Sequence, residues 1–114
     1  MDAFKINGGN RLTGNVTISG AKNAALPILM SAILSDTTIV IDNVPRLNDI
    51  ETTIKLLCQL GAEVSWVGEN SLSINASTID QHRASYELVK TMRASILVLG
   101  PLLAKFGHAE VSLP

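Results

Sequence analysis

Hydrophobic side chains recur along this chain with two periods, and the change between them separates predicted strands from predicted helices. Residues 4–18 alternate apolar and polar positions on either side of Gly8-Gly9-Asn10, which predicts short strands with one buried face. Residues 23–34 are apolar almost throughout, so the helix predicted there is expected to be packed on nearly every side. Pro27 is expected in the first turn of that helix, where a missing N–H costs little.

A second helix is predicted over residues 49–60. Its buried stripe consists of apolar residues one turn apart, namely Ile50, Ile54, Leu57 and Leu60. Asn48 followed by Glu51 has the spacing of a capping box, which predicts Asn48 as the N-cap, and Gly61 is expected to end the helix. Cys58 lies beside the stripe and is interpreted as a small packing residue rather than a nucleophile.

Short strands are predicted between and after the helices, at residues 39–41, 62–67, 71–74 and 109–113, the second and third of which form a β-hairpin. Residues 76–85 are polar and predicted as a loop. A last helix is expected to begin near Met92, to be interrupted at Gly100-Pro101 and to end at Gly107.

The chain contains an internal repeat with an offset of 70 residues. Residues 23–26 and 93–96 each open an apolar helix that carries one proline, and each helix is followed by a short strand that ends in proline. The pattern predicts one complete α/β unit followed by the start of a second. Because repeat units cannot bury their apolar faces alone, we expect the chain to be part of a longer protein.

Composition narrows the class of protein. Of the 114 residues, 46% are hydrophobic and 17% are charged, and the net charge is −1. A nearly neutral chain gives no general field for binding nucleic acid or an anionic membrane. No apolar run reaches the roughly 18 residues that span a bilayer, and the first residues do not resemble a signal peptide. A single cysteine favours a reducing compartment, so we expect a cytoplasmic protein.

The candidate chemistry lies at residues 19–29, where a small-residue turn delivers Lys22 and Asn23 to the start of the first apolar helix. Free backbone N–H groups and the positive end of the helix dipole favour an anion there. The alternative is that Asn23 is merely an N-cap and Lys22 a solvated turn residue. The turn is neither a Walker loop nor a Gly-x-Gly-x-x-Gly motif, and no residues have metal-ligand spacing.

Arg93 opens the last helix at the position that the repeat makes equivalent to Asn23. A guanidinium at a helix start opposes the dipole, a cost that an anion bound there would offset. The arginine fork also suits bidentate contact with phosphate. The alternative is an ordinary surface arginine. Arg46 and Asp49 flank a loop that is a candidate to face the same anion site. Only the proximity of these residues in the sequence supports this.

Several segments together resemble a known family. They are residues 16–28, Asn43-Val44-Pro45, Leu60-Gly61-Ala62, residues 88–95 and residues 111–114. These segments resemble the bacterial UDP-N-acetylglucosamine 1-carboxyvinyltransferases, a branch of the enolpyruvyl transferase family. The matches are collinear and cover essentially the whole chain. The sister branch that acts on shikimate 3-phosphate has a Lys-Ser pair where this chain has Lys22-Asn23.

The resemblance implies an α/β fold of two domains, each an inside-out α/β barrel built of repeated βαβαββ units. This chain would supply about one and a half units. Residues 1–20 would be strands of the second domain, and residues 21–114 would be the first part of the catalytic domain. The remainder of the enzyme would then be a missing segment or a second polypeptide.

The resemblance also implies an activity without metal or cofactor, namely transfer of the enolpyruvyl group of phosphoenolpyruvate to the 3′-hydroxyl of UDP-N-acetylglucosamine. Lys22 and Asn23 match phosphoenolpyruvate-binding positions, and Arg93 matches a UDP-sugar-binding position. A 3-phosphoshikimate 1-carboxyvinyltransferase and a non-catalytic binding module of the same fold are the alternatives. These small molecules, rather than nucleic acid or membrane, are the expected partners.

Two departures limit what the resemblance implies. The catalytic cysteine and aspartate of the family would both lie beyond Pro114, and Cys58 does not align with that cysteine. We therefore expect this chain alone to be inactive. Asn48 stands where many members of the family carry lysine.

Overall fold

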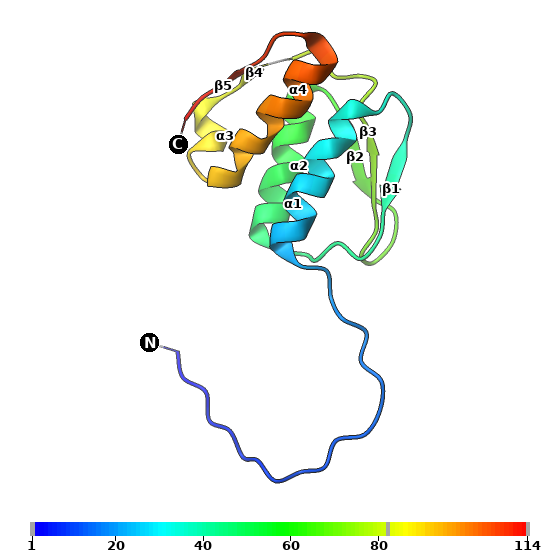
Figure 1. Ribbon diagram of the computed structural model, residues 1–114, viewed down its shortest axis with the longest axis vertical. Coiled ribbons are helices and arrows are strands. Elements are labelled where there is room, and N and C mark those ends of the chain that lie inside the picture. Colours follow the sequence, from blue (N-terminus) through cyan, green and yellow to red (C-terminus); the bar gives the residue numbers. More distant parts are fainter. Residues whose placement is uncertain (1, 82, 114) are drawn as a thin grey trace.

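Helices and a three-stranded sheet form two layers in the body of the protein, and an extended N-terminal segment leaves that body (Figure 1). The computed structural model describes residues 2–81 and 83–113. Met1 and Pro114, which end the two predicted domain ranges, lie outside the described residues. No helix in the described ranges is long and apolar enough to cross a membrane.

The first repeat unit alternates helices with short strands. Its elements are α1 (Lys22–Ser31) with the 3-10 turn η1 (Ala32–Leu34), β1 (Ile39–Ile41), α2 (Asn48–Leu60), β2 (Glu63–Trp66) and β3 (Leu72–Asn75). The strands lie in the order β1-β3-β2, and both pairings are antiparallel. Leu72 and Ile74 of β3 are buried between half-buried polar residues, as expected for a strand with one face on the core. The predicted β-hairpin is confirmed.

The second unit begins with β4 (Arg83–Ala84) and passes through helices to β5. The helical elements are α3 (Tyr86–Val89), the 3-10 helix η2 (Arg93–Val98) and α4 (Leu99–Phe106), and β5 is Glu110–Val111. β4 and β5 pair in parallel, so this part forms a β-α-β crossover. At the offset of 70, β5 corresponds to β1 and the start of η2 to the start of α1. The structure thus bears out the predicted repeat.

The C-terminal end of α2 forms as predicted, but its N-terminal end does not. Gly61 has φ 113°, and its N–H donates to the Cys58 carbonyl while Ala62 N–H donates to that of Leu57. Leu47, not Asn48, occupies the N-cap, and no side chain caps the helix. The predicted capping box is therefore wrong. The connection before α2 is bound to the hairpin turn by the Val44 N–H bond to the Asn70 carbonyl.

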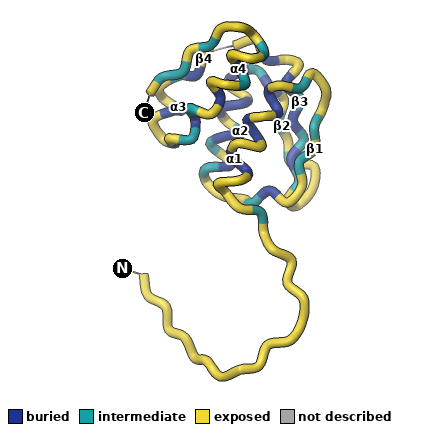
Figure 2. Tube along the Cα trace, in the orientation of Figure 1, coloured by how far each residue is buried: buried dark blue, intermediate teal, exposed yellow. Residues whose placement is uncertain are grey.

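Two predictions about α1 are also wrong. The helix begins at Lys22, so Pro27 is its sixth residue and lies inside the helix rather than in its first turn. Only one face is buried, through Ala25, Leu26, Leu29 and Met30, whereas Ile28 is 49% exposed. The helix thus has one buried and one exposed face (Figure 2), and the exposed face is apolar at Ile28.

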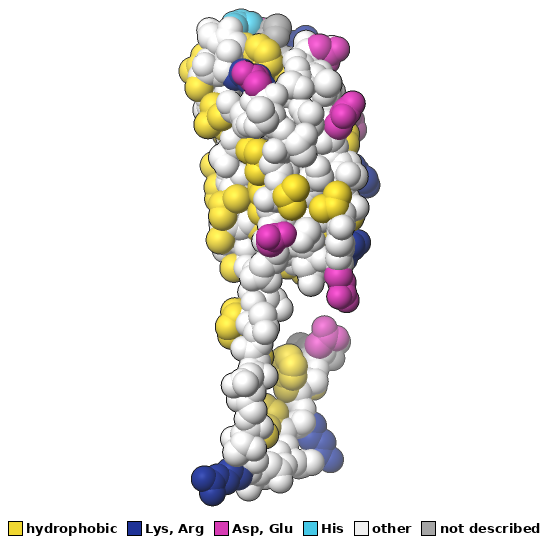
Figure 3. All heavy atoms as spheres, turned by 90° about the vertical axis from the view of Figure 1, so that its right-hand side faces the viewer, with side chains coloured by type: hydrophobic (Ala, Val, Ile, Leu, Met, Phe, Trp, Pro, Cys, Tyr) yellow, Lys and Arg dark blue, Asp and Glu magenta, His cyan; other side chains and the backbone are white. Residues whose placement is uncertain are grey.

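The N-terminal segment forms no strand in the described residues, contrary to the prediction for residues 4–18. Its apolar residues are between 78% and 96% exposed, namely Phe4, Ile6, Leu12, Val16 and Ile18. Figure 3 shows hydrophobic side chains spaced along a narrow extension of the body. An extended segment becomes a strand only beside a partner strand, and the described body places none next to it. Its assignment to a second domain stays a prediction.

The last helix differs from its prediction in two details. The change from 3-10 to α-helix falls between Val98 and Leu99, and Gly100 and Pro101 lie in the first turn of α4, where proline is tolerated. The helix runs on through Gly100 and Pro101, so the interruption predicted there is wrong. Gly107 ends α4 as predicted, with φ 72° and an N–H bond to the Leu103 carbonyl at 2.8 Å.

One hydrophobic core joins both units. Its centre consists of fully buried side chains from α1, α2, β3 and α4, among them Leu29, Ile50, Leu57, Leu72 and Leu102. The predicted stripe of α2 faces this core, with Ile54 at its partly buried edge. Cys58 is exposed, so its interpretation as a packing residue is wrong.

Candidate functional site

Lys22 and Asn23 are the first two residues of α1. Ala21 occupies the N-cap with extended backbone (φ −89°, ψ 137°) and offers no side-chain cap. The first helical hydrogen bond runs from Ala25 N–H to the Ala21 carbonyl at 2.9 Å. The N–H groups of the residues before Ala25 are thus without helical partners. Asn23 is not the N-cap, so that alternative is wrong, and its exposed amide has no partner among the described residues.

The turn before α1 rests on the segment that follows β1. A Cβ built on Gly20 would collide with the Asn43 carbonyl oxygen and lie 3.1 Å from Pro45 Cδ. Asn43 has φ 57°, and its side-chain N–H donates to the Ile18 carbonyl at 3.3 Å. Only glycine therefore allows the chain to enter α1 here. The fold thus brings together two segments that carry the resemblance, residues 16–28 and Asn43-Val44-Pro45.

Lys22 binds Asp49, which is the second residue of α2. The distance from Lys22 Nζ to Asp49 Oδ2 is 3.1 Å, and the side chains are 45% and 34% exposed. α1 packs beside α2, and both helices run in the same direction, so the ion pair joins their starts (Figure 1). Lys22 is therefore not simply solvated, as the alternative interpretation had it. Its ammonium keeps two further N–H donors for a ligand.

Arg93 is the first residue of η2, the helical segment that packs beside α1. Its side chain is exposed and makes no hydrogen bond or ion pair within residues 2–81 and 83–113. η2 continues into α4, which runs in the same direction as α1 (Figure 1). The structure thus unites Lys22 and Asn23 on one helical turn and places Arg93 on the neighbouring helix without direct bonds to either.

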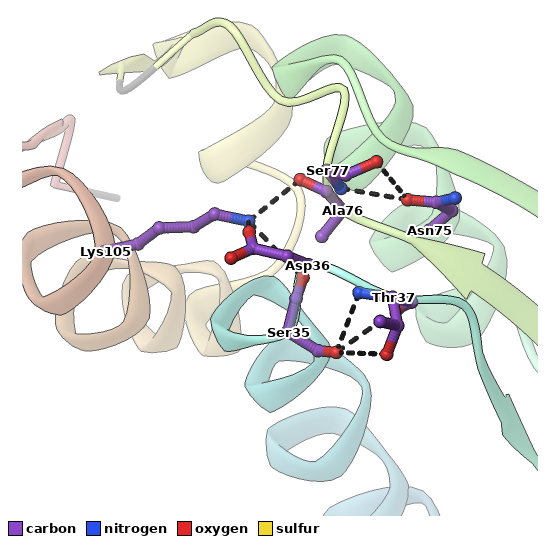
Figure 4. A network of polar contacts seen from close by, with 7 residues as sticks. All are labelled: Ser35, Asp36, Thr37, Asn75, Ala76, Ser77 and Lys105. Carbon is purple, nitrogen blue, oxygen red and sulfur yellow. Dashed lines mark hydrogen bonds and ion pairs between the residues drawn. The ribbon is translucent and has the colours of Figure 1, made fainter.

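Lys105 anchors the helix that follows Arg93. It is 15% exposed, and its Nζ donates to the carbonyl oxygens of Ala76 at 2.9 Å and Ser35 at 3.4 Å (Figure 4). It also pairs with Asp36 Oδ1 at 3.2 Å. Ser35 precedes β1 and Ala76 follows β3, and because these strands are antiparallel, one side chain fixes α4 to a single end of the sheet. This fixes the position of the second unit relative to the first.

The sequence did not single out Asp49 as a partner of Lys22. Asp49 is an acidic residue in the first turn of α2, and no local pattern connects it with a lysine in another helix. Arg46, which was considered with it, binds elsewhere. Its Nε donates to the Glu69 carbonyl at 2.8 Å, and its Cζ lies 3.9 Å from the centre of the Trp66 ring.

A hollow of about 490 Å³ lies away from these residues and is lined by Gln59, Gln81, Arg83, Ser85, Tyr86 and Ser112. A smaller hollow of about 140 Å³ lies behind the Gly20 turn, against Ala21, Ala24, Ile28 and the segment after β1. Among the described residues, no group of three His, Cys, Asp or Glu side chains is placed to hold a metal ion.

The arrangement at the helix starts is suited to binding anions. A lysine held by a carboxylate, an unpaired amide, free backbone N–H groups and an unpaired guanidinium lie on two adjacent helices. Cations and N–H groups at helix starts bind phosphate and carboxylate groups.

Comparison with known proteins assigns this chain to a family. Residues 6–114 match the model of the EPSP synthase (3-phosphoshikimate 1-carboxyvinyltransferase) family. The chain therefore belongs to this family of enolpyruvyl transferases.

Within it, the chain is 60% identical to the UDP-N-acetylglucosamine 1-carboxyvinyltransferase of Idiomarina loihiensis and 59% identical to that of Dichelobacter nodosus. Both comparisons cover all of this chain, which spans 27% of the length of each of these relatives. The resemblance stated from the sequence is confirmed.

The solved structures support the same fold. The enolpyruvyl transferase NikO from Streptomyces tendae matches 90% of this chain and 24% of its own chain, with a TM-score of 0.73 and 26% identity. The predicted enolpyruvyl transferase fold is therefore confirmed for the part of it that this chain forms.

Proposed function

We propose that this chain is part of an enzyme that transfers the enolpyruvyl group of phosphoenolpyruvate to the 3′-hydroxyl of UDP-N-acetylglucosamine. Phosphate is released, and the reaction is the first committed step of peptidoglycan synthesis. The names of the 60% identical relatives support this activity. The structural observation that carries it is the start of α1, where Lys22 and Asn23 lie at uncapped backbone N–H groups.

Lys22 and Asn23 bind phosphoenolpyruvate in this proposal, and Arg93 binds the UDP-sugar. Both substrates carry several negative charges, so cations at the starts of neighbouring helices bind them and stabilise the charge that moves onto the leaving phosphate. Holding both substrates at one place also supplies orientation, worth up to several kcal/mol of the barrier. α1 and η2 are in contact, which supports a site shared by the two substrates.

The N-terminal segment has a separate role in the complete enzyme. We place residues 1–20 in strands of a second domain and residues 21–114 in the first part of the catalytic domain. The free apolar side chains of the segment, from 78% to 96% exposed, support a partner supplied by the remainder of the enzyme. That remainder also supplies the catalytic cysteine and aspartate, so this chain alone is inactive. We place the enzyme in the cytoplasm, a reducing compartment in which a single, exposed cysteine stays a free thiol.

A second candidate activity follows from the description of the family model, which names 3-phosphoshikimate 1-carboxyvinyltransferase. Asn23, in place of the serine of that branch, argues against it. A binding module without activity is the third candidate.

The test is phosphate release from phosphoenolpyruvate by the full-length protein. We expect release that depends on UDP-N-acetylglucosamine and not on shikimate 3-phosphate. Release with shikimate 3-phosphate alone would replace the proposed function with the second candidate, and release with neither would favour the binding module.

A further inference from the structure

The ion pair between Lys22 and Asp49 has a use beyond joining two helices. Lys22 is in the first turn of α1, where the helix dipole disfavours a cation and no acidic residue of the same turn compensates it. Asp49 is in the first turn of α2, where the dipole favours a carboxylate. The 3.1 Å contact therefore brings the disfavoured cation to a favoured anion of the neighbouring helix.

Asp49 is itself held firmly in place. Its carbonyl oxygen accepts a hydrogen bond from Thr53 Oγ1 at 2.8 Å, and Thr53 is fully buried. Ile50, the next residue, is also fully buried. The backbone that carries the carboxylate is thus part of the core of the protein, whereas Lys22 reaches it from an exposed position on a long side chain.

We propose that Asp49 is a positioning residue for Lys22, an inference that rests on the proposed function. Asp49 accepts one of the three N–H donors of the ammonium and holds Nζ between the starts of α1 and α2. The two remaining donors are then available to the phosphate of phosphoenolpyruvate. A free lysine side chain loses rotamer entropy when it binds a ligand, and Asp49 removes part of that loss beforehand.

This role differs from simple charge neutralisation in its consequences. A carboxylate that only neutralised Lys22 would repel the anionic ligand, and its removal would tighten binding. If the carboxylate instead positions Lys22, its removal weakens binding of the anionic ligand. An asparagine keeps a hydrogen-bond acceptor and loses the charge, so Asp49→Asn separates the two effects.

The test measures binding of inorganic phosphate to the full-length protein in the presence of UDP-N-acetylglucosamine, by calorimetry. Phosphate is the released product and gives no turnover. We expect Asp49→Ala to raise the dissociation constant about threefold to fivefold, the range typical of an exposed ion pair. We expect Asp49→Asn to bind phosphate no more weakly than the unchanged protein.

The matched control is Glu51→Ala. Glu51 is in the same first turn of α2, is exposed and has no ion pair within the described residues. We expect its substitution to change phosphate binding less than twofold. An equal loss in Glu51→Ala and Asp49→Ala would show a general effect of charge at the start of α2 and would overturn the inference. So would tighter binding in both Asp49 variants.

A double substitution separates this inference from the proposed function. If Asp49 acts through Lys22, adding Asp49→Ala to Lys22→Ala changes phosphate binding no further. If Lys22→Ala weakens phosphate binding but the single substitution Asp49→Ala has no effect, only the positioning role is wrong. If Lys22→Ala leaves phosphate binding unchanged, the assignment of Lys22 in the proposed function fails, and the inference fails with it.

Discussion

Lys105 donates a hydrogen bond to the carbonyl oxygen of Ala76 at 2.9 Å, and this bond joins the second repeat unit to the end of the first. Ala76 is 1% exposed, so its carbonyl oxygen depends on partners within the protein. The apolar stem of Lys105 is buried while its ammonium reaches three oxygens at the ends of β1 and β3. The relative position of the two units, and hence of α1 and η2, rests partly on this one side chain.

Lys105→Met is expected to destabilise the protein by about 1–3 kcal/mol, because methionine fills the volume but removes the charged donor of the carbonyl oxygens of Ala76 and Ser35. The Ala76 carbonyl keeps only its bond from Ile79 N–H at 3.2 Å. The ion pair with Asp36, which is 82% exposed, contributes little of this. Thermal unfolding of the full-length protein measures the effect. Lys55→Met, at an exposed position of α2, is the control and should leave the melting temperature nearly unchanged. Equal melting temperatures for the two variants would contradict the role of Lys105.

Gly61→Ala is expected to destabilise the protein by more than about 1 kcal/mol, because φ is 113° and the new Cβ would lie 2.7 Å from Asp80 Oδ1 and 2.8 Å from the Thr78 carbonyl oxygen. Gly100→Ala is the matched control. A Cβ on Gly100, in the first turn of α4, meets no atom within 4 Å. We expect it to stabilise the protein by up to about 1 kcal/mol, again by thermal unfolding. Destabilisation by both substitutions to the same extent would refute the steric argument.

Gly20→Ala is expected to raise the KM for phosphoenolpyruvate, because the new Cβ would collide with the Asn43 carbonyl oxygen and displace the turn that places Lys22. A displacement of a substrate-positioning group by about 1 Å can also lower the catalytic rate on the order of 100-fold. Steady-state kinetics of the full-length enzyme measure the change. Gly100→Ala, in the first turn of α4, where a Cβ meets no atom within 4 Å, should leave the KM for phosphoenolpyruvate unchanged. A normal KM in Gly20→Ala would show that the turn tolerates a side chain.

Ser95→Ala and Thr53→Val are expected to change stability in opposite directions. The Ser95 hydroxyl is buried and has no hydrogen-bond partner within the described part of the chain, so its removal should stabilise the protein by about 1 kcal/mol. The Thr53 hydroxyl donates to the Asp49 carbonyl at 2.8 Å, so its removal should destabilise by about 1 kcal/mol. Melting temperatures that shift in the same direction would contradict this difference.

The features that could be predicted from the sequence are those fixed by nearby residues. The buried stripe of α2 and the stop at Gly61 follow from helical periodicity and from one residue that adopts positive φ at little cost. The hairpin of β2 and β3 and the end of α4 at Gly107 are of the same kind. The repeat offset also predicted that the start of α1 has a counterpart at the start of η2.

Features that depend on distant contacts could not be predicted in this way. The N-cap of α2 is Leu47 rather than Asn48, and the connection before the helix is held by the bond from Val44 N–H to the Asn70 carbonyl in the hairpin turn. The N-terminal alternation forms no strand because a strand needs a neighbour that the described residues do not supply. The Lys22–Asp49 pair joins two helices whose relative placement only the folded chain defines.

The central claim is that the starts of α1 and η2 bind the two substrates separately, Lys22 for phosphoenolpyruvate and Arg93 for the UDP-sugar. The most direct measurement is KM for each substrate in Lys22→Ala and Arg93→Ala variants of the full-length enzyme, with Lys55→Ala as the control. The account predicts that Lys22→Ala mainly raises KM for phosphoenolpyruvate and Arg93→Ala mainly raises KM for UDP-N-acetylglucosamine, each by about tenfold or more. If both variants keep the KM values of Lys55→Ala for both substrates, the two helix starts are not the binding site.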